Sequence, residues 1–484
     1  MRFKLPYLSL CLIALSTAYA SETIEIDSLE ALAEYAHKDN VHVRLLPGTY
    51  QLSDSDMGLL FNMNEKPYGF TGSNPKSVTY LYFSGSDSSY DLTGAKIEMH
   101  SELNAAYGYR EVYEVFVSGN RNTIKGLKLH DVGDTPAKHR AKAVCIIGND
   151  NVLEGADLYV QGSTPYGYGH LLGKGGGAFV PLRKHSCILV CGERNKIIGC
   201  KVKQHAFGHA IVMQGAVDTL VKDCYVEGEM RTTDDMLAET EGLAFDVGFK
   251  SHYPPGKIMP GQIKCLAEDG VRTYANGAFF GKRRTGPVEV INCTVKNMRS
   301  GITLGMEKGP SKIVNSTVIG YQERGYSIGS NGKILNCQGD AKYGPLLTFI
   351  GARTKNCEID LILLPETSEF AVPRLLEVNG SGHKIRLRNL EGTQRDRPAP
   401  IVFGESDWGD IHLFRAPDSD PRNYSGANDC TIVNETNMPI AFSELTQDCQ
   451  AITNGKLQKD LGQNNRVQRL PTIVAALGNA DTAQ

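Results

Sequence analysis

The sequence predicts an all-β fold in which the chain winds into a parallel β-helix. Short apolar-alternating runs, each with a polar or small residue near its middle, recur from about residue 110; they span 122–129, 151–158, 195–202, 219–226, 289–295, 312–318 and 333–337. Equivalent positions lie 21 to 24 residues apart, as from Cys200 to Cys224. This period excludes helical repeats of ~33 residues or more and propeller blades. It fits coils whose strands stack ~4.8 Å apart.

A short capping helix is predicted over about residues 28–38, ahead of the coils. Ser28 is a suitable N-cap, and Leu29, Leu32 and Ala36 follow at helical spacing. A strand over 41–46 then reaches a Pro-Gly corner. A helix over the first coil would shield its unpaired backbone. We expect the cap and first coils in 21–110, the β-helix proper in 111–400, and a C-terminal cap and tail in 401–484.

Repeated asparagine and cysteine positions indicate ladders of stacked side chains. Asn292, Asn315 and Asn336 recur at one place in the coil, where a side-chain amide can satisfy turn backbone. Eleven cysteines follow residue 20, an odd number without a CxxC pair or a Cys/His metal spacing. We interpret them as small buried hydrophobic residues. Disulfide bonds between neighbours such as Cys187 and Cys191, or between 430 and 449, are the alternative in an oxidising compartment.

The first twenty residues have the form of a secretory signal peptide. Arg2 and Lys4 precede an apolar run over 8–15, and Ala18 and Ala20 form a small-residue cleavage site. The run is too short for a membrane span, although an uncleaved anchor is the alternative. We therefore expect cleavage after Ala20 and a secreted or periplasmic protein. The net charge of -3 gives no basic surplus, which argues against a nucleic-acid partner.

The coils resemble a known superfamily. The Leu46-Pro-Gly-Thr-Tyr50 element, the Asn-x-Ile-x-Gly coils and the signal peptide are similar to the right-handed parallel β-helix, pectate-lyase-like superfamily of secreted carbohydrate-active enzymes. The resemblance covers roughly residues 40 to 390 and identifies no subfamily. The Lys/Arg pattern of chondroitinase-B-like lyases and the paired Asp motifs of polygalacturonases are not evident. The resemblance implies a right-handed β-helix that acts on carbohydrate.

Two inserts interrupt the coils, near 163–180 and 227–288, and between and within them lie the candidate site residues. Inserts in repeat proteins form surface loops, often around the binding face. The stretch 185–274 is unusually rich in histidine, arginine, lysine, tyrosine and acidic residues. The predicted catalytic residues are His209, His205, His185, Tyr274 and Arg272; the predicted substrate-binding residues are Lys184, Arg231, Lys250, Gln214 and Tyr168.

We interpret these residue types as the requirements of β-elimination on a uronate. That reaction needs a cation for the carboxylate, a base for the carbon-bound proton and an acid for the departing oxygen. His209 or His205 would be the base, and Tyr274 or His185 the acid. Arg231, Lys250 or Arg272 would bind the carboxylate. The expected partner is an acidic polysaccharide or its oligosaccharides, cleaved at the glycosidic bond or dehydrated.

Two other functions stay open. A glycoside hydrolase would use paired carboxylates, and the acidic run over 227–241 with Asp246 supplies candidates: Asp234, Glu239 and Glu241. A non-catalytic glycan-binding β-helix would need no catalytic pair, and any one histidine here is more often structural than catalytic. No metal ligands are assigned. The acidic run is a candidate for Ca²⁺, which carboxylate oxygens bind.

Overall fold

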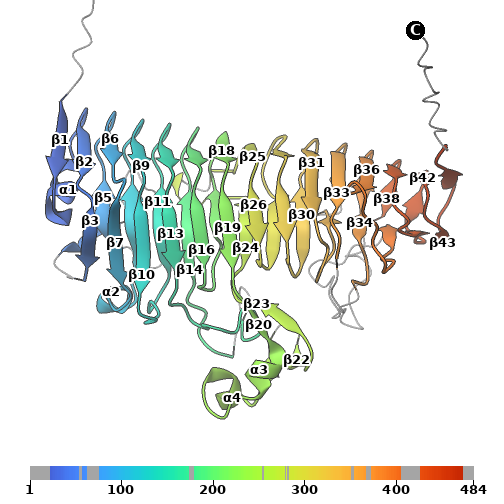
Figure 1. The fold of residues 1–484 in the computed structure, drawn as a ribbon, viewed down its shortest axis with the longest axis horizontal. Helices are drawn as coiled ribbons and strands as arrows, with labels where there is room; N and C mark the ends of the chain where they lie inside the picture. Colours follow the sequence, from blue (N-terminus) through green and yellow to red (C-terminus); the bar gives the residue numbers. More distant parts are fainter. Residues whose placement is uncertain are drawn as a thin grey trace, which may run out of the picture.

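The protein is an elongated stack of parallel coils, as the computed structural model in Figure 1 shows. The structure describes residues 22–53, 57–62, 76–173, 179–252, 255–277, 279–280, 283–349, 354–366, 372–404 and 426–471. The signal-peptide stretch, the 174–177 part of the first insert and the stretch around Trp408 lie outside these residues. In the described part of the chain, no helix is long and apolar enough to span a membrane.

Two long sheets form the walls of the stack. The smaller sheet contains β4 (Leu59–Asn62), β5 (Lys76–Phe83), β8 (Glu111–Val117), β11 (Ala141–Ile146), β14 (His185–Val190), β17 (Ile211–Gln214), β24 (Asp269–Tyr274), β27 (Ser300–Leu304), β30 (Arg324–Ile328), β32 (Leu347–Thr348), β34 (Leu376–Val378), β37 (Ile401–Phe403), β40 (Ile440–Phe442) and β43 (Leu457–Asp460).

The larger sheet contains β1 (Thr23–Ile26), β2 (His42–Leu45), β3 (Gly48–Leu52), β6 (Ser89–Asp91), β7 (Ala95–His100), β9 (Thr123–Lys125), β10 (Lys128–Val132), β12 (Val152–Glu154), β13 (Asp157–Val160), β15 (Lys196–Ile198), β16 (Lys201–Gln204), β18 (Thr219–Lys222), β19 (Tyr225–Gly228), β25 (Val288–Ile291), β26 (Thr294–Lys296), β28 (Lys312–Val314), β29 (Thr317–Ile319), β31 (Lys333–Gly339), β33 (Glu358–Leu363), β36 (Lys384–Asn389), β39 (Thr431–Asn434), β42 (Gln450–Thr453) and β44 (Arg466–Arg469).

One coil passes through one strand of the smaller sheet and then two of the larger, as in β8, β9 and β10 before β11 begins the next coil. Each strand pairs in parallel with its counterpart one coil on: β11 with β14, β12 with β15 and β13 with β16. The described pairings of these two sheets are all parallel except that of β4 with β5. The predicted all-β parallel β-helix is confirmed.

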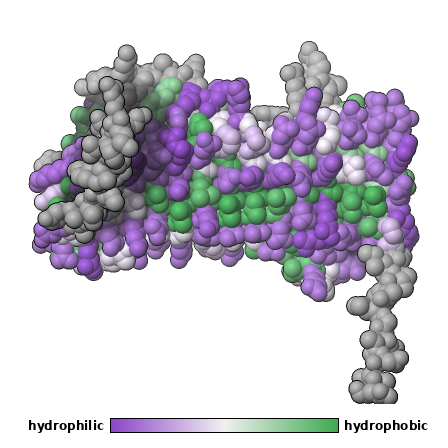
Figure 2. All heavy atoms as spheres, turned by 90° about the horizontal axis from the view of Figure 1, so that it is seen from above, coloured by the Kyte–Doolittle hydropathy of each residue, from purple (hydrophilic) through white to green (hydrophobic). Residues whose placement is uncertain are grey.

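The core is a set of stacked apolar ladders inside the coils. One ladder runs through paired residues of the larger sheet: Leu129, Leu158, Val202, Val226, Val295 and Val318. All are buried, and burying each such side chain contributes about 1.5–3 kcal/mol. Figure 2 shows apolar residues also forming a band along one outer face of the molecule. Regular stacking therefore aligns equivalent side chains on the outside as well as the inside.

The predicted ladders of polar corners and cysteines are present. Asn292, Asn315 and Asn336 all have a φ near +50°, which asparagine tolerates well, and the Asn336 amide donates to the Asn315 side-chain oxygen at 2.9 Å. All eleven described cysteines are buried free thiols. Thiols such as that of Cys293 donate to backbone carbonyls inside the coil. The cysteines are therefore core residues, as predicted.

Helices are few in the described chain. Helix α1 (Leu29–Tyr35) begins where predicted, with the Ser28 hydroxyl accepting from the Ala31 N–H at 3.2 Å. Its Leu29 and Leu32 join the core, while its role as an end cap stays a prediction. Helix α2 (Leu103–Ala106) is a single turn. The boundaries proposed for the domains likewise stay predictions.

The second predicted insert leaves the stack between β19 and β24. This excursion, residues 229–268, contains β20 (Met230–Thr232), α3 (Thr233–Leu237), α4 (Leu243–Asp246), β21 (Lys250–Ser251), β22 (Gly256–Lys257) and β23 (Ile263–Cys265). It projects from one side of the coils in Figure 1. Near the C-terminal end, β35 (Gly380–Ser381), β38 (Ala427–Asn428) and β41 (Thr446–Gln447) form a small parallel sheet.

Candidate active site

A groove of about 430 Å³ crosses four consecutive strands of the smaller sheet: β11, β14, β17 and β24. Its described lining comprises Arg140, Ala141, Lys142, Leu182, Lys184, Ser186, Leu189, His209, Val212, Gln214 and Tyr274. Three of these side chains are cationic, and none is a carboxylate. The groove thus has the charge expected for an acidic ligand.

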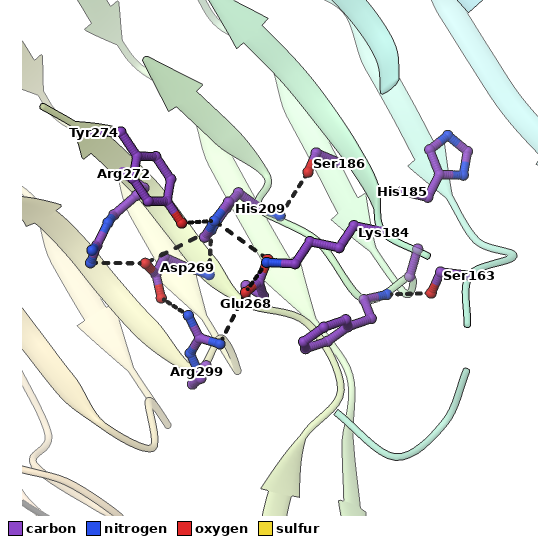
Figure 3. Close-up of polar contacts among 12 residues, drawn as sticks. Ser163, Lys184, His185, Ser186, His209, Glu268, Asp269, Arg272, Tyr274 and Arg299 are labelled. Atoms are coloured by element: carbon purple, nitrogen blue, oxygen red, sulfur yellow. Dashed lines mark hydrogen bonds and ion pairs between the residues drawn. The ribbon is translucent and has the colours of Figure 1, made fainter. Parts of the chain in front are cut away.

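His209 and Tyr274 form the central polar contact of the groove (Figure 3). The His209 Nε2 atom lies 2.8 Å from the Tyr274 hydroxyl oxygen. On the other side of the ring, Nδ1 accepts the backbone N–H of Asp269 at 3.2 Å. Because Nδ1 is an acceptor, the proton of the neutral ring sits on Nε2. His209 therefore donates to Tyr274, which leaves the tyrosine proton available to the groove.

Burial determines the charge states of this pair. It lowers the pKa of His209 to about 4, against the opposing effect of the Glu268 and Asp269 carboxylates. Burial likewise raises the pKa of Tyr274, and the Glu268 carboxylate adds to that increase. At neutral pH the imidazole is uncharged and the phenol is protonated. The sequence-based assignment of His209 as the base meets two obstacles: a low pKa and an occupied Nδ1.

Two ionised carboxylates lie directly behind the pair. Glu268 contacts the Lys184 ammonium at 2.7 Å and Arg299 at 3.2 Å. Burial alone would raise its pKa, but His209, Lys184 and Arg299 hold the pKa of Glu268 well below its usual range. Asp269 likewise has a pKa of about 2, because Arg299 and Arg272 outweigh its burial. Neither carboxyl carries a proton to donate at neutral pH.

Arg272 supports the site from behind. Its guanidinium contacts the Asp269 carboxylate at 3.2 Å and lies 5.1 Å from the centre of the Tyr274 ring. Arg299 contacts the same carboxylate at 3.1 Å. Arg272 was predicted to be catalytic or to bind the substrate carboxylate. Because it is paired with Asp269, we now interpret it as a positioning residue for Asp269 and Tyr274.

Gly208 sets the position of His209. A Cβ atom at Gly208 would lie 2.3 Å from the carbonyl oxygen of His185, far inside contact distance. Only glycine lets the backbone approach the preceding coil this closely. The His209 N–H also donates to the Ser186 hydroxyl at 3.3 Å. Two contacts with β14 thus fix the position of His209, which lies two residues before β17 begins.

The other predicted catalytic histidines lie elsewhere. His185 is fully buried and points into the coil interior, apart from the other labelled side chains of Figure 3. It does not line the groove, so its assignment as an acid finds no support. His205 follows β16 in the larger sheet, where it contacts Glu229 at 3.1 Å and packs against Tyr159. It does not line the groove, so its assignment as a base finds no support.

The predicted binding residues divide between groove and excursion. Lys184 and Gln214 line the groove. Arg231 instead contacts Glu239 at 2.5 Å, and the Tyr168 hydroxyl donates to the same carboxylate at 2.8 Å. Lys250 is exposed on β21. Arg231, Lys250 and Tyr168 therefore lie outside the described lining, and the first two form part of the excursion.

The acids proposed for a hydrolase also belong to the excursion. Asp234 accepts the Gly261 N–H at 3.0 Å, and Glu239 is held by Arg231 and Tyr168. Among described residues, no acid of the run over 227–241 lines the groove. Their contacts indicate that these side chains organise the excursion. The structure adds no support for Ca²⁺ in this run.

Arg140, Lys142, Ser186 and Arg299 were not among the predicted site residues. Arg140 is exposed and makes no side-chain hydrogen bond or ion pair with another described residue, whereas Lys142 contacts Glu111. The coil register could have revealed two of these residues, because Lys142 pairs with Ser186 one coil further along the chain. The first insert lengthens that coil to 44 residues, which hid the relationship. Arg299 directly precedes Ser300, the pairing partner of Asp269.

Comparisons with known proteins identify no sequence relative: no family model and no curated protein matches the chain. Among solved structures, a PL6 alginate lyase in complex with a trisaccharide is 11% identical, with a TM-score of 0.44 over 90% of this chain and 86% of that one. The catalytic domain of a GH87 alpha-1,3-glucanase with nigerose is 10% identical (TM-score 0.43; 93% and 68%). PfbA, a surface adhesin of Streptococcus pneumoniae, is 12% identical (TM-score 0.39; 91% and 85%).

Proposed function

We propose that the protein is a carbohydrate-active lyase that acts by β-elimination on an acidic, uronate-containing polysaccharide or its oligosaccharides. The observation that carries the proposal is the His209–Tyr274 pair at the wall of a groove with three cations and no described carboxylate. A hydrolase needs two carboxyl groups flanking the bond, one of them protonated. The described lining of the groove supplies neither, which favours elimination.

Arg140 is the residue best suited to bind the uronate carboxylate. It is exposed in the groove, and no described side chain competes for its guanidinium. Lys142 and Lys184 are each paired with a glutamate, so neither offers a free binding group. Neutralising the carboxylate acidifies the proton on the neighbouring carbon, C5. Binding and activation of the substrate would thus be one interaction.

Tyr274 would carry out both proton transfers. As tyrosinate it takes the C5 proton; the C4–C5 double bond forms as the C4–O4 bond breaks; the regained phenolic proton passes to O4. No water is consumed. The Nε2–H of His209 stabilises the tyrosinate, and the Arg272 guanidinium beside the ring does the same. His209 is then a positioning residue, not the base.

Incubation of the full mature chain with a panel of uronate glycans tests this proposal, with a neutral glucan as the control substrate. A lyase produces the ultraviolet absorbance of unsaturated uronates together with new chain ends. Tyr274→Phe should abolish the signal, whereas Tyr225→Phe should retain it because Tyr225 lies on β19 of the larger sheet. New reducing ends without absorbance would support the hydrolase instead. Retention on a glycan column without product would support the non-catalytic alternative.

A further inference from the structure

A second cluster of polar side chains lies inside the coils, separate from the groove. Glu114 of β8, Asp131 of β10 and His185 of β14 each offer one ligand atom, and these three atoms lie within 4.8 Å of one another. Glu114 and His185 are fully buried, and Asp131 is 4% exposed. The cluster joins the two sheets across the core, because β10 belongs to the larger sheet and the other two strands to the smaller.

The hydrogen bonds of the cluster leave several ligand atoms unused. Apart from the contact of Glu114 Oε1 with His185 Nε2, at 3.0 Å, both carboxylate oxygens of Glu114 and Oδ1 of Asp131 are buried without a hydrogen-bond partner. Asp131 uses its other oxygen, Oδ2, to accept the Gln161 N–H at 2.9 Å. Buried carboxylate oxygens without donors are costly in an apolar interior. A cation bound between the three side chains would satisfy these oxygens.

The orientation of His185 is that of a metal ligand. Its Nδ1 lies 3.0 Å from the Gln161 carbonyl oxygen, so Nδ1 carries the proton and donates it. When the ring is neutral, Nε2 presents its lone pair toward Glu114 Oε1, 3.0 Å away. Metal-bound histidines usually donate their other ring N–H to a carbonyl or carboxylate in this manner. Gln161 fixes both His185 and Asp131, as an outer-shell group would.

We propose that Glu114, Asp131 and His185 bind one divalent transition-metal cation of the zinc class in the core of the β-helix. Ligand atoms ~2.0–2.1 Å from one tetrahedral ion lie ~3.3 Å apart, close to the present Nε2–Oε1 separation. One nitrogen and two carboxylates suit Zn²⁺ or its neighbours better than Ca²⁺, which prefers oxygen ligands alone. The ion would neutralise both carboxylates and tie the two sheets together.

The sequence showed no metal motif, because the ligands come from three separate strands: β8 and β10 of one coil and β14, two coils on. The proposed site is also independent of the proposed lyase function: it shares no residue with the described groove lining. Its complete burial implies that the ion enters as the chain folds. The experiment therefore loads the metal by refolding.

The full mature chain is unfolded in denaturant with a chelator, then refolded with Zn²⁺ alone or Mn²⁺ alone, desalted and analysed for bound metal. We expect about one ion per chain and a higher melting temperature than for the metal-free refolded protein. Glu114→Gln should reduce bound metal at least tenfold. Asp340→Asn, which changes a buried carboxylate in a distant coil, should retain about one ion.

A second measurement covers the case in which Glu114→Gln does not refold. The wild-type chain refolded with Co²⁺ should show the visible absorption bands of a bound, low-symmetry ion. The proposal is overturned if the wild-type protein holds less than about a tenth of an ion per chain with each cation. The three side chains would then be held together by hydrogen bonds without a metal. Equal metal content in wild type and folded Glu114→Gln places the ion elsewhere and overturns it as well.

Discussion

The Nε2 atom of His209 lies 2.8 Å from the hydroxyl of Tyr274, and its Nδ1 accepts the N–H of Asp269. These two contacts fix the tautomer of the imidazole, so the histidine is a donor to the tyrosine. The residue that faces the groove with a transferable proton is consequently Tyr274. This relationship distinguishes the proposed mechanism from one in which His209 itself removes the C5 proton.

Tyr274→Phe should lower kcat by about 10²- to 10⁴-fold, the usual contribution of a positioned proton-transfer group. The ring and its packing remain, so KM should change little. Steady-state kinetics on the substrate identified from the uronate panel measures both constants. Tyr225→Phe, a matched loss of one hydroxyl on the other sheet, should leave them unchanged. An active Tyr274→Phe enzyme would assign the proton transfers to another residue.

The rate should rise with pH between about 6 and 9. Burial raises the pKa of Tyr274 above its ordinary value, so tyrosinate is a minor species that increases tenfold per pH unit. The pKa of His209, about 4, keeps the imidazole neutral over this whole range. A plot of log kcat/KM should therefore have a slope near one. An inflection between pH 6 and 7 would instead indicate an imidazole base.

Arg140→Ala should raise KM by roughly tenfold or more while kcat falls less. A charge-assisted hydrogen bond contributes about 1.5–3 kcal/mol, and this guanidinium has no described partner that would compensate. Arg140→Lys should recover part of the loss. Arg121→Ala, in which an exposed arginine paired with Asp87 is removed, is the control. Unchanged KM in Arg140→Ala would place the carboxylate elsewhere in the groove.

Arg299→Met should destabilise the fold by about 3–5 kcal/mol. Arg299 is 5% exposed and contacts Glu268 and Asp269, so its removal leaves buried carboxylates without their cation. Urea unfolding measures the change in free energy. Arg386→Met removes an exposed partner of Glu435 and should cost less than about 1 kcal/mol. Equal losses in both variants would contradict the buried network.

His383 should make the protein less stable in acid. Its Nδ1 accepts the Cys357 N–H and its Nε2 donates to the Asn379 carbonyl, so the folded site suits the neutral ring. Burial lowers its pKa to about 4 from 6.5 in the unfolded chain. The unfolded state therefore binds the proton first. Stability is fully present above pH 6.5 and falls by about 3 kcal/mol as pH drops through 4.

Urea unfolding at several pH values between 7 and 4 measures this effect. His383→Gln removes the titrating ring, so the difference in unfolding free energy between wild type and variant should shrink as the pH falls. A difference that stays constant with pH would show that His383 binds its proton equally well in both states.

The coils could be predicted from sequence because stacking repeats the same residue types at a short period. Side chains such as those of Cys200 and Cys224 recur at equivalent core positions, and the structure confirms them. His209 and Tyr274 were found because Tyr274 lies on a regular strand and His209 just before one, and both strands follow this period. The structure brings these two together in one hydrogen bond.

The rest of the site depended on details that the pattern does not contain. His185 starts β14 with its side chain inward, and a shift of one residue along a strand reverses the face on which a side chain lies. Arg140 and Lys142 were hidden because an insert separates their coil from the next. The acids of the excursion were singled out because they are numerous. Their partners lie within the excursion and the insert before it, as Arg231 and Tyr168 do for Glu239.

The mass of the products formed from a defined uronate oligosaccharide tests the central claim most directly. Elimination at the glycosidic bond gives two fragments whose masses sum to that of the substrate, and dehydration gives one product lighter by one water. Either result, lost in Tyr274→Phe and retained in Tyr225→Phe, is what the proposed mechanism predicts. Fragments that together carry one additional water, with ¹⁸O incorporated from labelled solvent at the cleaved bond, would contradict it.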